Sequence, residues 1–206
     1  MRRLATLVTA ALVTAALLSG CGQAADPDGA PDAKRPPATA AVAPANAVAA
    51  DGPRNDYDTL FLQMMISHQQ QGREMLKLGR EKGIREDVVN LAGAIDVTEA
   101  EEVETMRRWL SSWNVPVTDV ADPGIHAAHG GKPATGPEEI TALREATGAD
   151  FETKFLNLLI AHQHNAVEMA QQQARNGRNE TVKQFAGRIE LSRTQQIKQM
   201  LALVSG

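Results

Sequence analysis

One stretch of the chain occurs twice: residues 61–75 read FLQMMISHQQQGREM, and residues 155–169 read FLNLLIAHQHNAVEM. Each position of the second copy lies 94 residues after its counterpart, as His162 lies after His68. The same offset relates three further apolar positions, Ala92, Ile95 and Met106, to Ala186, Ile189 and Met200. A repeat of this kind predicts one structural unit that is present twice, with the two copies packed together.

Both copies have apolar side chains at intervals of three to four residues, which is typical of amphipathic helices. Pro137 suits the first position of a short helix that runs to about Ala146 and is stopped by Gly148, while Asn179 suits an N-cap position. Four long helices are predicted over about residues 56–82, 85–113, 150–176 and 180–204. Two helical hairpins joined by a long crossover that carries the short helix form an all-α four-helix bundle.

The N-terminus has the parts of a secretory signal: Arg2 and Arg3, then an apolar run over residues 4–17, then Leu-Ser-Gly-Cys at residues 18–21. Leu-Ser-Gly-Cys resembles the lipobox of bacterial lipoproteins, in which the cysteine becomes the lipidated first residue. A transmembrane anchor is the alternative, but the apolar run is shorter than the roughly 20 residues that a span needs. Residues 1–20 are therefore predicted to be a signal peptide. Cys21 is the predicted lipidation site, which would anchor the chain to the cell membrane on its extracytoplasmic face.

Residues 21–53 are rich in Ala, Pro, Asp and Gly without apolar periodicity, which predicts a disordered tether after the lipidated Cys21. Residues 54–206 then form one bundle domain, long enough for a core. Cys21 is the only cysteine, so the mature chain has no free thiolate ligand. The formal net charge of −4 and the 3% of aromatic residues argue against nucleic-acid binding.

Histidine and methionine recur on one face of both repeated helices. His68 and Met75 are seven residues apart, and so are His162 and Met169, so each pair spans two helical turns. A pseudo-twofold bundle is expected to bring His68 and His162 near one another at its axis. Imidazole and thioether groups without thiolate favour copper, particularly Cu(I). The candidate metal ligands are His68, Met75, His162, Met169, Met65, Glu102, Met106 and Met200.

A structural interpretation of the same residues stays open. Methionines at helical spacing often fill cores, and a buried histidine often hydrogen-bonds to a neighbour, here Glu102 or Gln196. Glu102 is instead a ligand, or the partner of the second imidazole nitrogen, if a metal is bound. His164 is expected to face solvent, because it is two residues from His162 on the helix. His126 and His129 lie in a Gly-rich crossover where nothing pre-organises a site.

The sequence does not contain the motifs of several enzyme classes. A di-iron centre of the ferritin type needs Glu-x-x-His pairs, and the chain has none. It also has no His-Glu-x-x-His motif, no Gly-rich phosphate loop and no serine nucleophile motif. The chain is therefore not predicted to be an enzyme.

The repeated motif resembles the DUF305 family of bacterial envelope proteins over about residues 56–204. The first copy carries Phe61-Leu62, Met65-Ile66, His68 and Met75, then Glu102-Val103, Met106 and Trp109-Leu110. The second copy carries Phe155-Leu156, Ile160, His162, Ala166, Met169-Ala170, Ile197 and Met200. The resemblance implies a ferritin-like helical bundle that is usually exported, with some members similar to copper-binding or copper-resistance proteins.

The chain departs from the family pattern beside both histidines. Family members commonly have two adjacent histidines where this chain has His68-Gln69 and His162-Gln163. Methionine-rich segments, frequent between the copies in the family, are absent from residues 116–140. A glutamine amide is a poorer ligand for soft metals than an imidazole, so weaker or altered copper affinity is expected.

Two functional hypotheses follow from the sequence. The first is an extracytoplasmic lipoprotein whose bundle binds a copper ion for buffering, storage or delivery. The second is a metal-free module that uses the bundle surface as a sensor or to engage an envelope protein partner. Metal analysis of the protein distinguishes the two.

Overall fold

The structure is a computed structural model of the 206-residue chain, and it describes residues 48–82, 85–117 and 135–205. These residues contain helices and no strand. The helices are α1 (Asp56–Lys82), α2 (Glu86–Ser112), α4 (Pro137–Glu145), α5 (Gly148–Asn176) and α6 (Glu180–Ser205). The all-α prediction is confirmed, with four long helices and one short one. The predicted signal peptide, Cys21 and most of the predicted tether lie outside the described residues.

Individual residues set the ends of the helices. The Asn179 side chain accepts the N–H of Val182 at 3.1 Å, which makes it the N-cap of α6. Pro137 occupies the first turn of α4. Asn114, with a φ of 54°, follows α2 in the left-handed conformation that ends many helices. Gly148 was predicted to stop the short helix. Instead its φ of 60° lets the chain turn directly into α5, and the two residues before it are extended.

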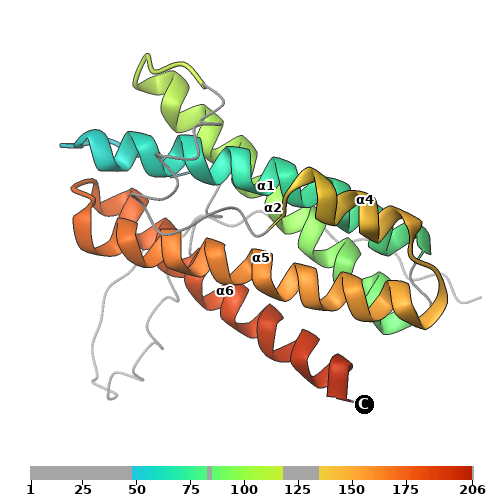
Figure 1. Ribbon diagram of the computed structural model, residues 1–206. Coiled ribbons are helices and arrows are strands. Elements are labelled where there is room, and N and C mark those ends of the chain that lie inside the picture. The colour runs from blue at the N-terminus through green and yellow to red at the C-terminus, as the bar shows by residue number, and fades with distance from the viewer. Residues whose placement is uncertain (1–47, 83–84, 118–134, 206) are drawn as a thin grey trace, which may run out of the picture. The chain divides into compact units, whose positions relative to one another are not determined.

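The long helices form two hairpins, α1 with α2 and α5 with α6, and α1 packs against α5 (Figure 1). The short helix α4 lies against both α1 and α5. The predicted bundle of two repeated hairpins is confirmed. None of the described helices has the length and the apolarity that crossing a membrane requires.

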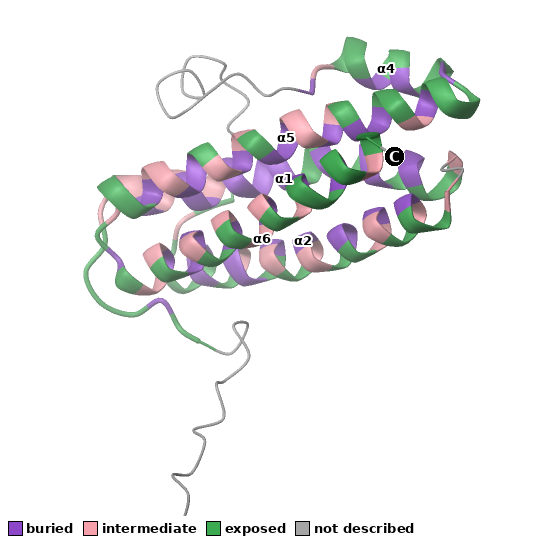
Figure 2. Cartoon of the chain, turned by 90° about the horizontal axis from the view of Figure 1, so that it is seen from below, coloured by how far each residue is buried: buried purple, intermediate pink, exposed green. Residues whose placement is uncertain are grey.

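Buried apolar side chains form two clusters, and buried residues follow the inward sides of the helices (Figure 2). The first apolar cluster includes Phe61, Leu62, Met65, Val103, Met106, Trp109, Ala166, Met169, Phe185 and Ile189. The second apolar cluster includes Met75, Leu76, Ile95, Phe151, Phe155, Leu156, Leu159, Ile197 and Met200. On each long helix the buried residues between the two clusters are mainly polar. They form the polar layer described below.

Two acidic residues at equivalent repeat positions join the hairpins. Asp58 of α1 is buried, and its carboxylate accepts the backbone N–H groups of Arg178 and Asn179, at 3.1 and 3.0 Å, in the loop between α5 and α6. Glu152 of α5, 94 residues later, accepts the side chain of Arg85 at 2.5 Å, just before α2. Each hairpin therefore holds the connecting loop of the other.

Part of the predicted tether packs against the bundle. The indole N–H of Trp109 donates to the Val48 carbonyl at 2.9 Å, and that of Trp113 donates to the Ala50 carbonyl at 3.0 Å. Ala50 is 1% exposed. Because these carbonyls satisfy two indoles at the edge of the core, the packed domain extends N-terminally of the predicted boundary at residue 54, to Val48.

Candidate functional site

The polar layer lies midway along the bundle, between the two apolar clusters. All four long helices contribute to it, so it includes both hairpins. Its members are His68 and Gln69 of α1, Glu99 and Glu102 of α2, His162 and Gln163 of α5, and Arg193 of α6. The 94-residue offset relates His68 to His162, Gln69 to Gln163, and Glu99 to Arg193.

His68 and His162 are in contact, as the repeat predicts. Their rings stack with centroids 3.8 Å apart and planes inclined by 7°. The two residues are 4% and 0% exposed. Since equivalent residues of a twofold arrangement meet only at its axis, the pseudo-twofold axis of the bundle passes through this pair.

The surroundings of His162 keep its ring uncharged. Burial first, and the positive charge of Arg193 second, lower its pKa from 6.5 to about 3. Nδ1 lies 2.9 Å from the hydroxyl of Thr135. Nε2 has no hydrogen-bond partner and lies against Gly72, where an added Cβ would be 2.6 Å from it. A neutral imidazole with one unpartnered nitrogen can act as a metal ligand.

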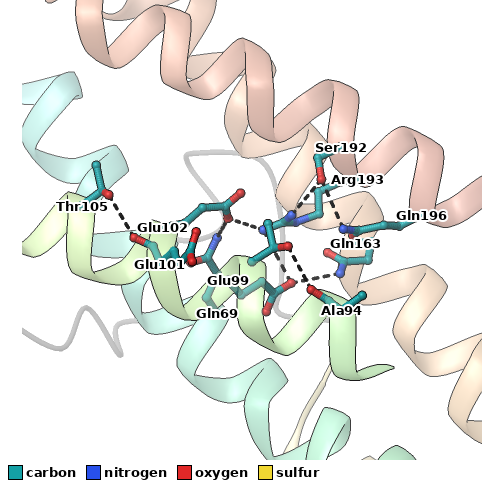
Figure 3. A network of polar contacts seen from close by, with 11 residues as sticks. Gln69, Ala94, Glu99, Glu101, Glu102, Thr105, Gln163, Ser192, Arg193 and Gln196 are labelled. Atoms are coloured by element: carbon teal, nitrogen blue, oxygen red, sulfur yellow. Dashed lines mark hydrogen bonds and ion pairs between the residues drawn. The ribbon is translucent and has the colours of Figure 1, made fainter. Parts of the chain in front are cut away.

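Arg193 is the positive centre of the polar layer (Figure 3). Its side chain is 0% exposed, lies 3.6 Å from Glu99 and forms a second ion pair with Glu102. Burial raises the pKa of Glu99, and the charge of Arg193 opposes that rise without cancelling it. One guanidinium thus pairs with two carboxylates across α2 and α6.

The glutamines beside the histidines are bound to these carboxylates (Figure 3). Gln69 donates to Glu102 at 2.6 Å, and Gln163 donates to Glu99 at 3.0 Å. Here each amide supplies a hydrogen bond to a largely buried carboxylate, which is otherwise costly to bury.

The structure divides the predicted methionine ligands between the two apolar clusters. Met65, Met106 and Met169 belong to the first cluster, and Met75 and Met200 to the second. All five are 7% exposed or less. They therefore lie on both sides of the histidine pair and do not gather at one point.

The stacked histidines cannot share one metal ion in the observed orientation. The lone pair of each ring nitrogen lies in its ring plane, and a bound ion lies about 2 Å from the nitrogen in that plane. Two nearly parallel planes at a stacking separation do not converge on such a point. Among the described residues, no three His, Cys, Asp or Glu side chains are placed to hold a metal ion.

The remaining predicted residues have other roles. Glu102 hydrogen-bonds to Gln69 and Arg193, where the sequence suggested a ligand or an imidazole partner. His164 is exposed, as predicted. His126 and His129 lie outside the described residues.

Sequence reasoning missed Thr135 and Gly72 as neighbours of His162, and did not assign Arg193 to an ion pair. One signal was available for Arg193. Residues that meet at a twofold axis are repeat equivalents, and position 99 carries a glutamate where position 193 carries an arginine. Thr135 has no such signal, because it lies in the crossover outside the repeat.

The DUF305 family, a domain of unknown function, matches residues 58–204. This chain belongs to the DUF305 family. No curated protein matches the DUF305 chain described here.

Solved structures share the DUF305 fold. A candidate secreted DUF305 protein from Streptomyces coelicolor is 27% identical, with a TM-score of 0.66 over 72% of this chain and 92% of that one. A DUF305 fragment from Deinococcus radiodurans is 23% identical, with a TM-score of 0.66 over 75% of this chain and 99% of that one. CopM in its Cu(I)-bound form is 23% identical, with a TM-score of 0.60 over 72% of this chain and 95% of that one.

Proposed function

We propose that this DUF305 protein binds copper on the extracytoplasmic side of the cell membrane and buffers, stores or delivers the metal. The observation that carries the proposal is the contact between two buried imidazoles, His68 and His162, at the centre of the bundle. The low pKa of His162 keeps this ring in its metal-binding form at neutral pH. CopM, a structural neighbour known in Cu(I)-, Cu(II)- and Ag-bound forms, supports the choice of metal.

The donor set of this chain suits a soft monovalent ion. Thioether and neutral imidazole ligands favour Cu(I) over hard cations. His68 follows Met65 by three residues on α1, and His162 lies against Gly72, three residues before Met75. We assign His68 with Met65 to one half-site and His162 with Met75 to the other. In this proposal the protein binds its metal and does not catalyse a reaction.

An anaerobic Cu(I) titration against a colorimetric chelator tests the proposal on the full chain. We expect His68→Gln, His162→Gln and Met75→Leu each to lower the stoichiometry or the affinity. His164→Gln is the matched control, because His164 is exposed and only two residues from His162. Unchanged binding in both buried-histidine variants would contradict the copper site. A wild-type protein that binds no copper would leave the metal-free partner-binding alternative.

The membrane location rests on the Leu-Ser-Gly-Cys sequence at residues 18–21. A lipid on Cys21 would anchor the bundle through the segment that precedes Val48. We expect Cys21→Ser to move the protein from the membrane fraction to the soluble fraction. Retention of that variant in the membrane fraction would exclude lipidation of Cys21 as the anchor.

A further inference from the structure

Thr135 contacts His162 from outside the four long helices. Its hydroxyl oxygen lies 2.9 Å from Nδ1, and the two residues are 6% and 0% exposed. Thr135 lies in the crossover just before α4, outside the repeated hairpins. His162 is therefore oriented by a hydroxyl group that the repeated helices do not supply.

The contact with Thr135 is compatible with two forms of the neutral ring. If the hydroxyl donates to Nδ1, the proton of the ring is on Nε2. If Nδ1 carries the proton and donates to the hydroxyl oxygen, Nε2 keeps a lone pair in the ring plane. The surroundings of Nε2 decide between the two forms, because the hydrogen bond at one ring nitrogen fixes the state of the other.

The Nε2 atom of His162 faces no hydrogen-bond acceptor, whichever nitrogen carries the proton. It has no hydrogen-bond partner, and the Cα hydrogen that replaces a side chain at Gly72 points toward it. A buried N–H directed at a C–H group loses its hydrogen bond and meets a group of the same polarity. A lone pair in that position instead receives a weak C–H contact. The environment therefore favours the form with the proton on Nδ1.

We propose that Thr135 accepts a hydrogen bond from Nδ1–H of His162 and so leaves Nε2 as the unprotonated nitrogen of the ring, the one that can bind copper. Thr135 is then the positioning residue of the His162 half-site, and the lack of a side chain at Gly72 leaves room for the imidazole ring. The identity of the metal rests on the proposed function. The state of the ring does not, and it is measurable without copper.

Nitrogen-15 NMR of the metal-free full chain at neutral pH tests the state of the ring. We expect the His162 signals to show protonated Nδ1 and unprotonated Nε2. Thr135→Val keeps the shape of the side chain and removes the hydroxyl, so the signals should change to a mixture of both forms, and Thr135→Ser should restore them. Thr141→Val, which alters another residue lining the surface pocket beside Thr135, is the control and should leave them unchanged. Protonated Nε2 in the wild type would overturn the proposal.

Copper binding by the same variants tests the consequence. Loss of a partner that orients a metal-bound histidine typically costs about 10- to 100-fold in affinity, and we expect this loss for Thr135→Val but not for Thr135→Ser. Gly72→Ala should also weaken binding, because its Cβ would lie 2.6 Å from Nε2. Unchanged affinity in both Thr135→Val and Gly72→Ala would overturn the positioning role. If the wild type binds no copper, the proposed function fails, while the NMR result still decides the state of the ring.

Discussion

His162 shows how strongly a single buried side chain depends on its neighbours. Four groups meet its ring: the ring of His68, the hydroxyl of Thr135, the backbone of Gly72 and, through its charge, Arg193. None of them offers a compensating negative charge to a protonated ring. Burial therefore determines the charge of His162.

The low pKa of His162 predicts acid sensitivity of the metal-free protein. The ordinary pKa of 6.5 applies to the unfolded chain and a pKa of about 3 to the folded one. Between these values the unfolded chain binds a proton that the folded chain does not, so stability is lost as the pH falls from 6.5 toward 3. The limit is about 5 kcal/mol. Glu99, with its raised pKa, contributes the opposite slope.

Urea unfolding of the metal-free protein between pH 7 and pH 4 measures this effect. The free energy of unfolding should fall less with decreasing pH in His162→Gln than in the wild type. His164→Gln should retain the wild-type pH dependence, because His164 is exposed. Parallel profiles for wild type and His162→Gln would show that His162 is not the acid-sensitive group.

At the scale of the elements, the start of α1 is fixed to the loop between α5 and α6 by one carboxylate. Asp58 accepts hydrogen bonds from Asn55, Gln173, Arg178 and Asn179 and is 0% exposed. Asp58→Asn replaces one acceptor oxygen with a donor that faces other donors. We expect a loss of about 2–4 kcal/mol in the free energy of unfolding, since hydrogen bonds to a buried charged group are among the strongest.

Glu152→Gln is the matched control for the Asp58 prediction. Glu152 occupies the equivalent repeat position, but its partner Arg85 has a side chain that is 37% exposed. Such partly solvated ion pairs contribute about 1 kcal/mol or less. Thermal and urea unfolding should therefore show a clearly larger loss for Asp58→Asn, and equal losses would contradict the role given to Asp58.

At the scale of the whole molecule, the two hairpins meet in a charged layer in which only some positions carry the same residue in both copies of the repeat. The histidines and glutamines are the same in both copies, whereas Glu99 in one copy faces Arg193 in the other. Two glutamates at these equivalent positions would repel one another at the axis. Because Glu99 and Arg193 carry opposite charges, the contact between these equivalent positions of α2 and α6 is attractive.

Arg193→Met tests how much the hairpins depend on this contact. It leaves Glu99 buried beside Glu102 without its positive partner, and removing one member of a buried ion pair typically costs about 3–5 kcal/mol. Glu102 also loses its partner, but its side chain is 13% exposed against 2% for Glu99. Adding Glu99→Gln removes the more deeply buried of the two uncompensated charges, so the double variant should regain part of the loss in urea unfolding. If the double variant is no more stable than Arg193→Met, the cost of the single change does not arise from the charge of Glu99.

The sequence by itself determined the architecture. Apolar spacing and the 94-residue repeat gave four long helices and their pairing, because helix formation and burial of an apolar face depend on local pattern. The repeat also gave the contact of His68 with His162, because equivalent residues on an inward face must meet at a twofold axis. The starts of two helices, at Asn179 and Pro137, follow from capping chemistry. The role of Gly148 differs from the prediction, because a glycine with positive φ can begin a helix as well as end one, and here it is the first residue of α5.

Only the tertiary structure decided what the histidine pair can do. Ring stacking, the contact with Thr135 and the approach of Gly72 depend on side chains brought together from distant parts of the chain, and no local pattern encodes them. The same holds for the division of the predicted methionine ligands between two apolar clusters, so that they do not gather at one point. Burial and nearby charge set the pKa of His162 and of Glu99, and both arise only when the hairpins close around the polar layer.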